Sequence, residues 1–288
     1  MRGAVEVVID AGLGNAMFEY AIGRALAVRH GRPLVLDTSF LCLSPGWTFD
    51  LPCFRLGVQQ VREMPFLLWR ARRKALRILD RAGLAPIRWV QESGQQFDAE
   101  VMNVHQPCIL MGYWQSERYF QSVEKQLREE FTIVPEQDPR SAWCLARIRQ
   151  VPSIALHVRR GDYLVSGDTE DVHGTCSLEY YEAALRLIVP RLGPRAELFV
   201  FSDDIPWARQ HIRFNLPTVF VDWNLERNYE DLRLMSSCRA VITANSTFSW
   251  WAGWLNPHPD KTVVVPRQWF RKAGMVSDLP SAAWVTAI

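Results

Sequence analysis

The chain has 288 residues and a mass of 33.2 kDa, with 48% hydrophobic and 22% charged residues and a formal net charge of +2. This composition is typical of a globular protein of about two domains, and it excludes a disordered or collagen-like chain. The low net charge also excludes a polycation that wraps nucleic acid, so we expect no nucleic-acid partner.

Several features bear on the compartment. No apolar run reaches the ~18–20 residues of a membrane-spanning helix, and the first residues have a strand pattern rather than that of a signal peptide. The six cysteines are scattered and none belongs to a Cys-x-x-Cys pair, which favours reduced thiols over a disulfide framework. We therefore expect a cytoplasmic protein.

The first 150 residues contain elements of mixed type. In chain order they are a strand at Val5–Ile9, a helix that follows Gly12-Leu13-Gly14 and ends near His30, a strand at Pro33–Asp37, a helix at 62–82, short strands near 87–90 and 108–111, and a helix near 117–130. We place a domain boundary near residue 150, which gives domains 1–150 and 151–288.

Strands and helices alternate more regularly in residues 151–288. The predicted strands are Ser153–His157, Glu197–Ser202, Thr218–Asp222, Ala240–Thr243 and Thr262–Val265. The clearest helix begins after Ser177 and is expected to end at Pro190. This alternation predicts an α/β fold with a Rossmann-like parallel sheet in the C-terminal half.

Polar residues follow each of these predicted strands. The clusters are His157–Tyr163, Ser202–Asp204, Asp222–Asn224, Asn245–Trp251 and Arg267–Trp269. Ligands of open α/β sheets bind outside the carboxyl ends of the strands, so we expect these clusters to share one cleft. Five of the 12 tryptophans lie in or just after the clusters, either as core residues or as a platform for sugar.

Three clusters have the chemistry of a nucleoside diphosphate site. Arg159 and Arg160 offer forked donors with a permanent charge. Residues 245–247 open a helix, whose N–H groups and dipole favour an anion. Asp203 and Asp204 offer acceptors for sugar hydroxyls or for the N–H edge of a base.

Each cluster also has a structural alternative. Arg159 and Arg160 are able to pair with Asp162 and another carboxylate, while Asp204 and Ser246 are able to cap the helices that follow them. The joint placement of the clusters, rather than any single residue, favours a ligand site.

The motifs of other nucleotide and metal sites are incomplete. Gly12-Leu13-Gly14 follows a strand, but Met17 stands where the dinucleotide fingerprint needs a third glycine or alanine. No histidine pair has zinc-helix spacing and no Asp-x-Asp occurs. We therefore expect no metal, with arginines and backbone donors neutralising a diphosphate instead.

The long motifs of this chain resemble those of the α-1,2-fucosyltransferases of glycosyltransferase family 11. The segments that carry the resemblance are Gly12–Asn15 with Phe18 and Tyr20, His157–Tyr163, Tyr180-Tyr181, Phe201–Asp204 and Ala244–Trp251. They run in family order from residue 12 to about 256. Ala11 and Ala16 depart from the usual opening Gly-Gly-Leu-Gly-Asn-Gln, which puts a polar contact from position 16 in doubt.

The resemblance implies a two-domain GT-B-like fold and an inverting, metal-independent reaction. L-fucose would pass from GDP-fucose to the 2-hydroxyl of an acceptor sugar, usually a galactose. Residues 151–288 would hold the donor and residues 1–150 would lie mainly on the acceptor side. GDP-fucose is a substrate, so no cofactor is expected.

Residue roles follow from the resemblance position by position. Arg159 and Arg160 would contact the diphosphate and stabilise the leaving GDP, and Asp162 is the candidate base, with ion pairing to an arginine as its alternative. The expected donor-binding set also contains Gly12, Gly14, Asn15, His157, Asp203, Asp204, Asn245, Ser246, Thr247, Phe248 and Ser249.

The expected partners are GDP-fucose and a galactose-terminated oligosaccharide, either free or linked to a lipid. Residues 61–82 hold seven cations against two anions, interleaved with apolar residues. Two hypotheses for residues 62–82 stay open, a solvated helix face and peripheral contact with the inner face of the plasma membrane. The rival functions are a fucosyltransferase of other linkage and a non-catalytic protein that binds a nucleotide sugar or glycan.

Overall fold

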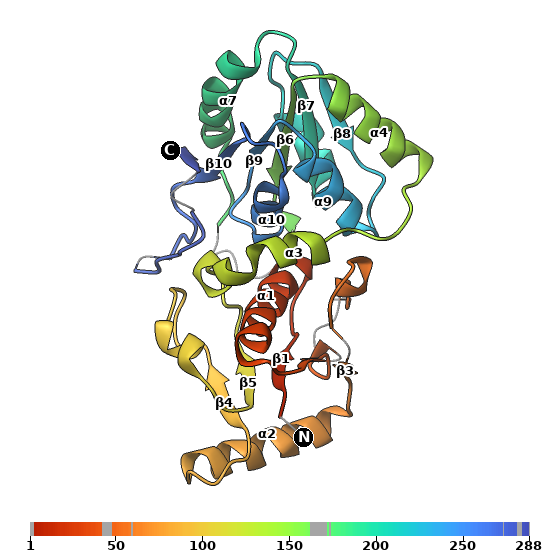
Figure 1. Ribbon diagram of the computed structural model, residues 1–288. Coiled ribbons are helices and arrows are strands. Elements are labelled where there is room, and N and C mark those ends of the chain that lie inside the picture. Colours follow the sequence, from red (N-terminus) through yellow and green to blue (C-terminus); the bar gives the residue numbers. More distant parts are fainter. Residues whose placement is uncertain are drawn as a thin grey trace. The chain divides into compact units, whose positions relative to one another are not determined.

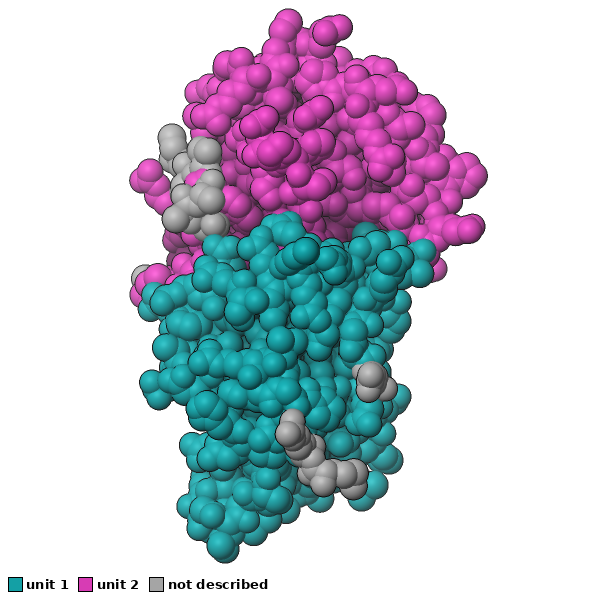
Figure 2. Space-filling model, in the orientation of Figure 1, with its two compact units in different colours: residues 1–134 teal, residues 135–288 magenta. Residues whose placement is uncertain are grey.

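The computed structural model describes residues 3–41, 48–58, 60–161, 172, 174–272, 274–280 and 284–287. The chain forms two compact units, Met1–Val134 and Pro135–Ile288 (Figure 2). The division lies before the expected position near 150, because helix α4 (Pro139–Gln150) packs on α9 (Asn228–Ser236) within the second unit. Each unit is built on its own parallel sheet, so the predicted α/β class is confirmed (Figure 1).

The sheet of the first unit has the order β3-β2-β1-β5-β4. Its strands are β1 (Val5–Val8), β2 (Leu34–Asp37), β3 (Gln60–Arg62), β4 (Arg88–Gln91) and β5 (Cys108–Met111). All neighbours are parallel, and Val5 of the central strand lies opposite Leu34 and Cys108. Strand β3 was not predicted, because only three residues form it and two of them are exposed.

Two helices of the first unit follow the predictions and one does not. Helix α1 (Leu13–His30) ends at Gly31, which adopts a left-handed conformation with φ 59° and donates to the last carbonyls. Helix α2 (Phe66–Arg81) begins after Pro65. The helix expected near 117–130 is instead divided into the 3-10 turns η4 (Glu117–Tyr119) and η5 (Gln121–Val123) and helix α3 (Glu124–Glu130). The reason is Phe120, whose φ of −129° leaves the helical region.

The remaining short elements of this unit are the 3-10 turns η2 (Leu51–Cys53) and η3 (Ala99–Asn103). They do not add to the sheet. Their buried side chains, such as Leu51 and Val101, extend the core of the first unit.

The sheet of the second unit has the order β11-β10-β9-β6-β7-β8. Its strands are β6 (Ser153–Val158), β7 (Glu197–Ser202), β8 (Thr218–Val221), β9 (Ala240–Ile242), β10 (Thr262–Pro266) and β11 (Val285–Ala287). The five predicted strands are confirmed, and β11 is added at the edge. The chain runs outward from β6 through β7 and β8, then returns to β9 on the other side of β6. The strand order therefore reverses between β6 and β9, which is where ligands bind in open α/β sheets.

Helix α4 leads into β6. In the described residues the helices between the strands are α7 (Leu178–Leu192), α8 (Ile205–His211), α9 and α10 (Thr247–Leu255). Helix α7 continues beyond Pro190, contrary to the prediction, and ends at Gly193 with φ 88°. Pro190 has no N–H to donate to the preceding turn, so one intrahelical bond is missing two residues before the helix ends. Trp250, Trp251 and Trp254 on α10 are buried and touch one another edge to face, so they are core residues rather than a sugar platform.

Candidate active site

The arginine loop, which is Arg159, Arg160 and Gly161 in the described residues, follows β6, the strand at the reversal point of the second sheet. Leu156 of β6 lies opposite Ile242 of β9, and Val158 lies opposite Ser202 of β7. The polar residues after these three strands therefore meet at one edge. The structure brings together the arginine loop, Asp203-Asp204 and the start of α10, as the sequence predicts.

Asp203 anchors the arginine loop. Its carboxylate accepts hydrogen bonds from the backbone N–H of Arg160 at 2.9 Å and of Gly161 at 3.0 Å, and it pairs with Arg159 Nε at 3.2 Å. A Cβ at Gly161 would lie 3.1 Å from this carboxylate, so glycine keeps the approach close. These contacts make Asp203 a positioning residue for the two arginines.

Asp204 and Trp207 hold the second arginine. Arg160 Nε lies 3.6 Å from Asp204 Oδ2, and the guanidinium sits 3.9 Å from the centre of the Trp207 ring. Asp204 also caps α8 by accepting from Trp207 N at 3.1 Å, so the capping alternative is confirmed. The side chains of Arg159 and Arg160 are 24% and 18% exposed to solvent, which leaves both within reach of a ligand.

Both arginines also form ion pairs, as the structural alternative predicted, but their partners are Asp203 and Asp204. The expected partner and candidate base, Asp162, lies outside the described residues, as does Tyr163. Carboxylate pairing orients a guanidinium without removing its charge. Pairing and ligand binding are therefore compatible at this edge.

His157 is a buried, uncharged member of the site. Its side chain is 4% exposed and its ring centre lies 5.8 Å from that of Phe248. Burial, aided by the charge of Arg159, lowers the pKa of His157 to about 3. Within the described part of the chain its Nδ1 has no hydrogen-bond partner. The ring is thus a neutral donor or acceptor and not a cation for the diphosphate.

The segment after β9 combines scaffold and accessible residues. Asn245 is buried and donates to the carbonyls of Gly174 and Trp269 at 3.2 and 3.3 Å. Ser249 Oγ donates back to the Ser246 carbonyl at 3.2 Å, while the Ser246 side chain makes no cap hydrogen bond. These contacts hold the first turn of α10, whose N–H groups have no intrahelical acceptors.

Thr247 and Phe248 are the half-buried members of that segment, at the first two positions of α10. Nearby, the Tyr180 hydroxyl lies 2.7 Å from the Thr243 carbonyl and 3.2 Å from that of Val264. It therefore ties the end of β9 to the middle of β10. The paired tyrosines of α7 are buried supports of this edge, since the Tyr181 hydroxyl donates to the His157 carbonyl at 3.1 Å.

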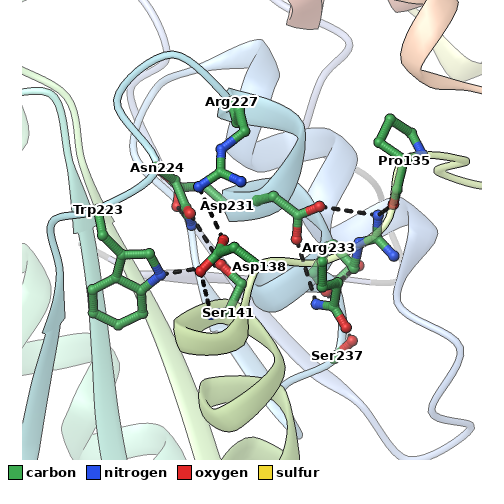
Figure 3. A network of polar contacts seen from close by, with 12 residues as sticks. Pro135, Asp138, Ser141, Trp223, Asn224, Arg227, Asp231, Arg233 and Ser237 are labelled. Atoms are coloured by element: carbon green, nitrogen blue, oxygen red, sulfur yellow. Dashed lines mark hydrogen bonds and ion pairs between the residues drawn. The ribbon is translucent and has the colours of Figure 1, made fainter.

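The cluster after β8 has a different role from the one expected. Trp223 Nε1 donates to Ser141 Oγ at 3.0 Å, Ser141 donates to Asn224, and Asn224 donates to Asp231 at 2.8 Å (Figure 3). Burial raises the pKa of Asp231 to about 7. This loop is fastened to α4 and α9, so its side chains are scaffold contacts and the expectation of five clusters in one cleft is too broad.

The same network fixes the segment that leads into α4. Asp138 caps α4 and pairs with Arg227 at 3.0 Å, and Arg233 donates to the Pro135 carbonyl at 2.6 Å (Figure 3).

After β10, Trp269 is also buried, while Arg267 and Gln268 are exposed. The tryptophans at this edge thus belong mainly to the core.

The glycine loop of the first unit opens α1 after β1. Gly12 is the N-cap and its carbonyl accepts from the N–H of Asn15 and of Ala16 at 3.0 Å. Asn15 Oδ1 accepts from Gln115 Nε2 at 3.0 Å, which joins this loop to the segment after β5. Gly12 and Asn15 are half-buried and Gly14 is buried.

No motif in the sequence selects three carboxylates at the carboxyl edge of the first sheet. Asp10 follows β1, Glu92 follows β4, and Glu19 lies on α1 with no exposed surface. Glu92 accepts from the N–H of Tyr113 and of Trp114 at 2.7 and 2.8 Å. The position of Asp10 directly after a predicted strand could have marked it as a site candidate in the sequence. Glu19 lies within an apolar helix, where no sequence pattern marks it.

The carboxyl groups of Asp10 and Glu19 interact with each other. Burial raises the pKa of both, and the charge of Asp10 adds to the rise at Glu19, whose pKa lies well above its ordinary value. Glu19 is the more deeply buried of the two. These directions favour the neutral form of Glu19, the more deeply buried acid, over the neutral form of Asp10.

The described residues lack two features. They contain no group of three or more histidine, cysteine or acidic side chains arranged to hold a metal ion. None of the helices that the structure describes is both long and apolar enough to cross a bilayer.

The family model for glycosyl transferase family 11 matches residues 84–285, which include the arginine loop, Asp203-Asp204 and all of α10. The chain belongs to this family. As a family 11 glycosyltransferase it is 31% identical over 277 residues to alpha-1,2-colitosyltransferase of Escherichia coli, covering 92% of this chain and 91% of that protein. It is also 42% identical over 133 residues to the O-antigen biosynthesis glycosyltransferase WbnK of Escherichia coli, covering 46% and 43%.

An animal relative aligns along most of this chain. Galactoside alpha-(1,2)-fucosyltransferase 1 of Plecturocebus brunneus is 27% identical over 271 residues, which is 88% of this chain but 66% of that protein. The alignment thus spans less than two thirds of the animal enzyme and less than half of WbnK.

Solved structures of transferases share the fold at low identity. A mutant of Arabidopsis thaliana FUT1 in complex with GDP matches with a TM-score of 0.53 and 10% identity, covering 91% of this chain and 70% of that one. NodZ alpha-1,6-fucosyltransferase co-crystallized with GDP gives 0.50 and 17%, covering 89% and 93%. The family 11 chain therefore has the expected two-domain, GT-B-like fold.

Proposed function

We propose that this glycosyltransferase moves L-fucose from GDP-fucose to the 2-hydroxyl of an acceptor sugar, with galactose as the acceptor residue. The observation that carries the proposal is the pair Arg159 and Arg160, partly exposed at the reversal point of the second sheet and beside the start of α10. The names of two relatives, a colitosyltransferase and a fucosyltransferase of 1,2 linkage, support that linkage.

The second unit is the proposed donor domain and the first unit the proposed acceptor side. Within the second unit, Arg159 and Arg160 contact the diphosphate, and Asp203 and Asp204 hold them there. The remaining proposed donor-binding residues are His157, Asn245, Ser246, Thr247, Phe248 and Ser249, together with Gly12, Gly14 and Asn15 of the first unit. Asn245 bonds to the Gly174 carbonyl and Ser249 to the Ser246 carbonyl, so their proposed role is to position the segment that opens α10.

The reaction is a single displacement at the anomeric carbon. The acceptor oxygen forms the new bond, the bond to the diphosphate oxygen breaks, and GDP leaves with the electron pair. Because negative charge grows on the leaving diphosphate, the guanidinium groups stabilise the transition state more than the ground state. No metal is part of this proposal.

The hydroxyl of the acceptor sugar loses a proton in this step, and a general base must take it. Asp162 stays a proposal from the sequence motif. Asp10 of the first unit is the alternative, because it is half-buried at a strand end, directly before the glycine loop, and burial raises the pKa of its neighbour Glu19 well above the ordinary value. An ionised carboxylate with a raised pKa is suited to general base catalysis.

A second candidate function is transfer of colitose. It is favoured by the match to alpha-1,2-colitosyltransferase over 92% of this chain. A donor panel separates the two sugars, and we expect the higher kcat/KM with GDP-fucose.

The decisive experiment incubates the purified chain with GDP-fucose and a panel of galactose-terminated oligosaccharides, free and lipid-linked. We expect GDP release coupled to a product whose new linkage, determined by NMR, is α-1,2 on galactose. Another linkage would replace the acceptor assignment. Absence of both transfer and donor hydrolysis would favour a non-catalytic binding protein. We also propose the cytoplasm as the compartment of the reaction.

A further inference from the structure

Helix α2 (Phe66–Arg81), the orange helix of Figure 1, presents three distinct faces. Counting about 100° per residue from Phe66 places its side chains around the axis. One face is packed on the first unit, a second is cationic and exposed, and a third is apolar and exposed. The third face is unusual, because a solvated helix normally turns polar side chains to water.

Three of the seven cations of residues 61–82 are engaged at the packed face, two of them on α2 itself and the third, Arg62, on the neighbouring strand β3. Trp69 is 3% exposed and donates from Nε1 to Asp37 at 3.2 Å. Arg72 makes a bidentate ion pair with the carboxylate of the buried Glu6, which Arg62 also contacts. Arg73 lies 5.3 Å from the ring centre of Trp69 and from that of Trp89. Helix α2 is therefore fixed to the sheet, and its orientation is set by buried contacts.

The cationic face holds the other four positive residues of this segment. Arg70, Lys74, Arg77 and Arg81 are all exposed and fall within an arc of about 60°. None of the four has an ion-pair partner among the residues that the structure describes. Asp80, the acid of this helix, lies on the packed side. The surplus charge thus points away from the protein with nothing to neutralise it.

The apolar face lies directly beside this cationic strip. It spans an arc of about 120° that contains no charged residue. Its members are Leu67, Leu68, Ala71, Ala75, Ile78, Leu79 and Ala82. Leu67, Leu68 and Ile78 are 75%, 62% and 58% exposed. Exposed apolar patches of this kind mark surfaces that contact a partner or a membrane.

The charge next to the patch decides which partner fits. A helix with an apolar face and a strip of cations lies in the plane of a bilayer, with its apolar side among the acyl chains and its cations at anionic headgroups. At about 1.5 Å per residue, the helix offers about 24 Å of such contact. A nucleic acid would use the cations and leave the apolar face in water.

We propose that α2 docks the first unit on an anionic membrane surface, with Leu67, Leu68 and Ile78 inserted and the four exposed cations at the headgroups. The inference does not depend on the sugar that the enzyme transfers. It gives the first unit a place at the surface where a lipid-linked acceptor would be found.

Co-sedimentation of the full chain with vesicles tests the proposal. We expect binding to vesicles of phosphatidylglycerol and phosphatidylcholine, loss of binding in high salt, and little binding to phosphatidylcholine alone. The triple variant Arg70→Gln, Arg77→Gln, Arg81→Gln should weaken binding about 100-fold, at about fivefold per cation near an anionic leaflet. The double variant Leu68→Ser, Ile78→Ser should weaken it at least about tenfold for each side chain.

Matched controls lie in the second unit. Arg149, Arg191 and Arg195 are exposed, so their triple change to glutamine removes the same charge, and Leu225→Ser removes a side chain that is 87% exposed. Both controls should bind vesicles like the wild type. Transfer to a water-soluble acceptor should be unchanged in the two α2 variants, which shows that they are folded.

Four outcomes would overturn the proposal. They are no vesicle binding by the wild type, equal loss in the controls, binding that ignores the apolar substitutions, and a dimer in light scattering that the Leu68→Ser, Ile78→Ser variant dissociates. Salt-sensitive retention of RNA or DNA that depends on the cations alone would assign the strip to nucleic acid instead.

Discussion

The substitution Asp203→Asn separates the positioning of the arginine loop from direct contact with the donor. The carboxylate of Asp203 accepts from two backbone N–H groups, at 2.9 and 3.0 Å, and pairs with Arg159 at 3.2 Å. Asparagine has almost the same size but one acceptor oxygen. One of the two loop N–H groups would therefore face an NH2 donor, and the charge opposite Arg159 would vanish.

The magnitude follows from these contacts. A hydrogen bond to a charged group contributes about 1.5–3 kcal/mol, and we take the lower end because water reaches the Asp203 side chain. The partly exposed ion pair adds less than about 1 kcal/mol, so we expect a loss of about 2 kcal/mol in unfolding free energy. A shift of the loop by about 1 Å would lower kcat/KM about 100-fold.

The assay measures fucose transfer at varied donor and acceptor, with the unfolding free energy from denaturant titration. We expect a raised KM for GDP-fucose, a lowered kcat and an unchanged KM for the acceptor. Asp222→Asn is the matched control, because Asp222 pairs with Arg140 and Arg209 after β8 and should leave kcat/KM unchanged. Wild-type kinetics in the Asp203→Asn enzyme would refute the anchoring role.

Arg159→Ala should lower kcat/KM by about 100–1000-fold with the fold intact, as loss of an electrostatic donor does elsewhere; near-normal turnover with an unchanged circular dichroism spectrum would remove Arg159 from the mechanism. Excess EDTA should leave transfer unchanged, and activity restored by Mg²⁺ or Mn²⁺ after its loss would speak for a metal. Asp10→Asn should lower kcat, whereas Glu19→Gln, which keeps a donor toward Asp10, should leave kcat unchanged. The acid limb of the pH–rate profile should lie above the usual range of an aspartate. An unaltered kcat in Asp10→Asn would exclude this base. Burial raises the pKa of Asp231 to about 7 in the folded protein, so between about pH 4 and about pH 7 the folded protein binds a proton that the unfolded chain releases. The free energy of unfolding should therefore fall as the pH rises from about 4 to about 7. Asp231→Asn should flatten that slope in thermal melts.

The repeating pattern of the second unit made its sheet predictable. Buried apolar runs separated by helical spacing identify β6 to β10, and the arginine loop and α10 motif follow at their ends. Strand β3 escapes prediction because its three residues are largely exposed and obtain their pairing from β2 alone. The break at Phe120 depends on tertiary packing of its buried ring, which no local spacing reveals.

The placement of the predicted residues at one sheet edge was more predictable than their contacts. The types of Asp203 and Asp204 are compatible with ligand contact, capping and ion pairing alike, and only tertiary contacts distinguish these roles. The Asp222–Asn224 loop follows a strand like the others, yet its partners on α4 and α9 are set by packing. Glu19 is hidden because an acid within an apolar helix becomes meaningful only once its neighbour Asp10 is known.

The two carboxylates beside the arginines have opposite effects on the donor. In the proposed mechanism they orient Arg159 and Arg160 before GDP-fucose arrives, so little reorganisation is needed when charge develops on the leaving phosphate. In the same proposed mechanism they repel the diphosphate, which would limit the affinity for the product GDP. Since tight binding of substrate and product alike would not raise kcat, a site with two cations and two nearby anions favours stabilisation of the transition state while it lets the product leave.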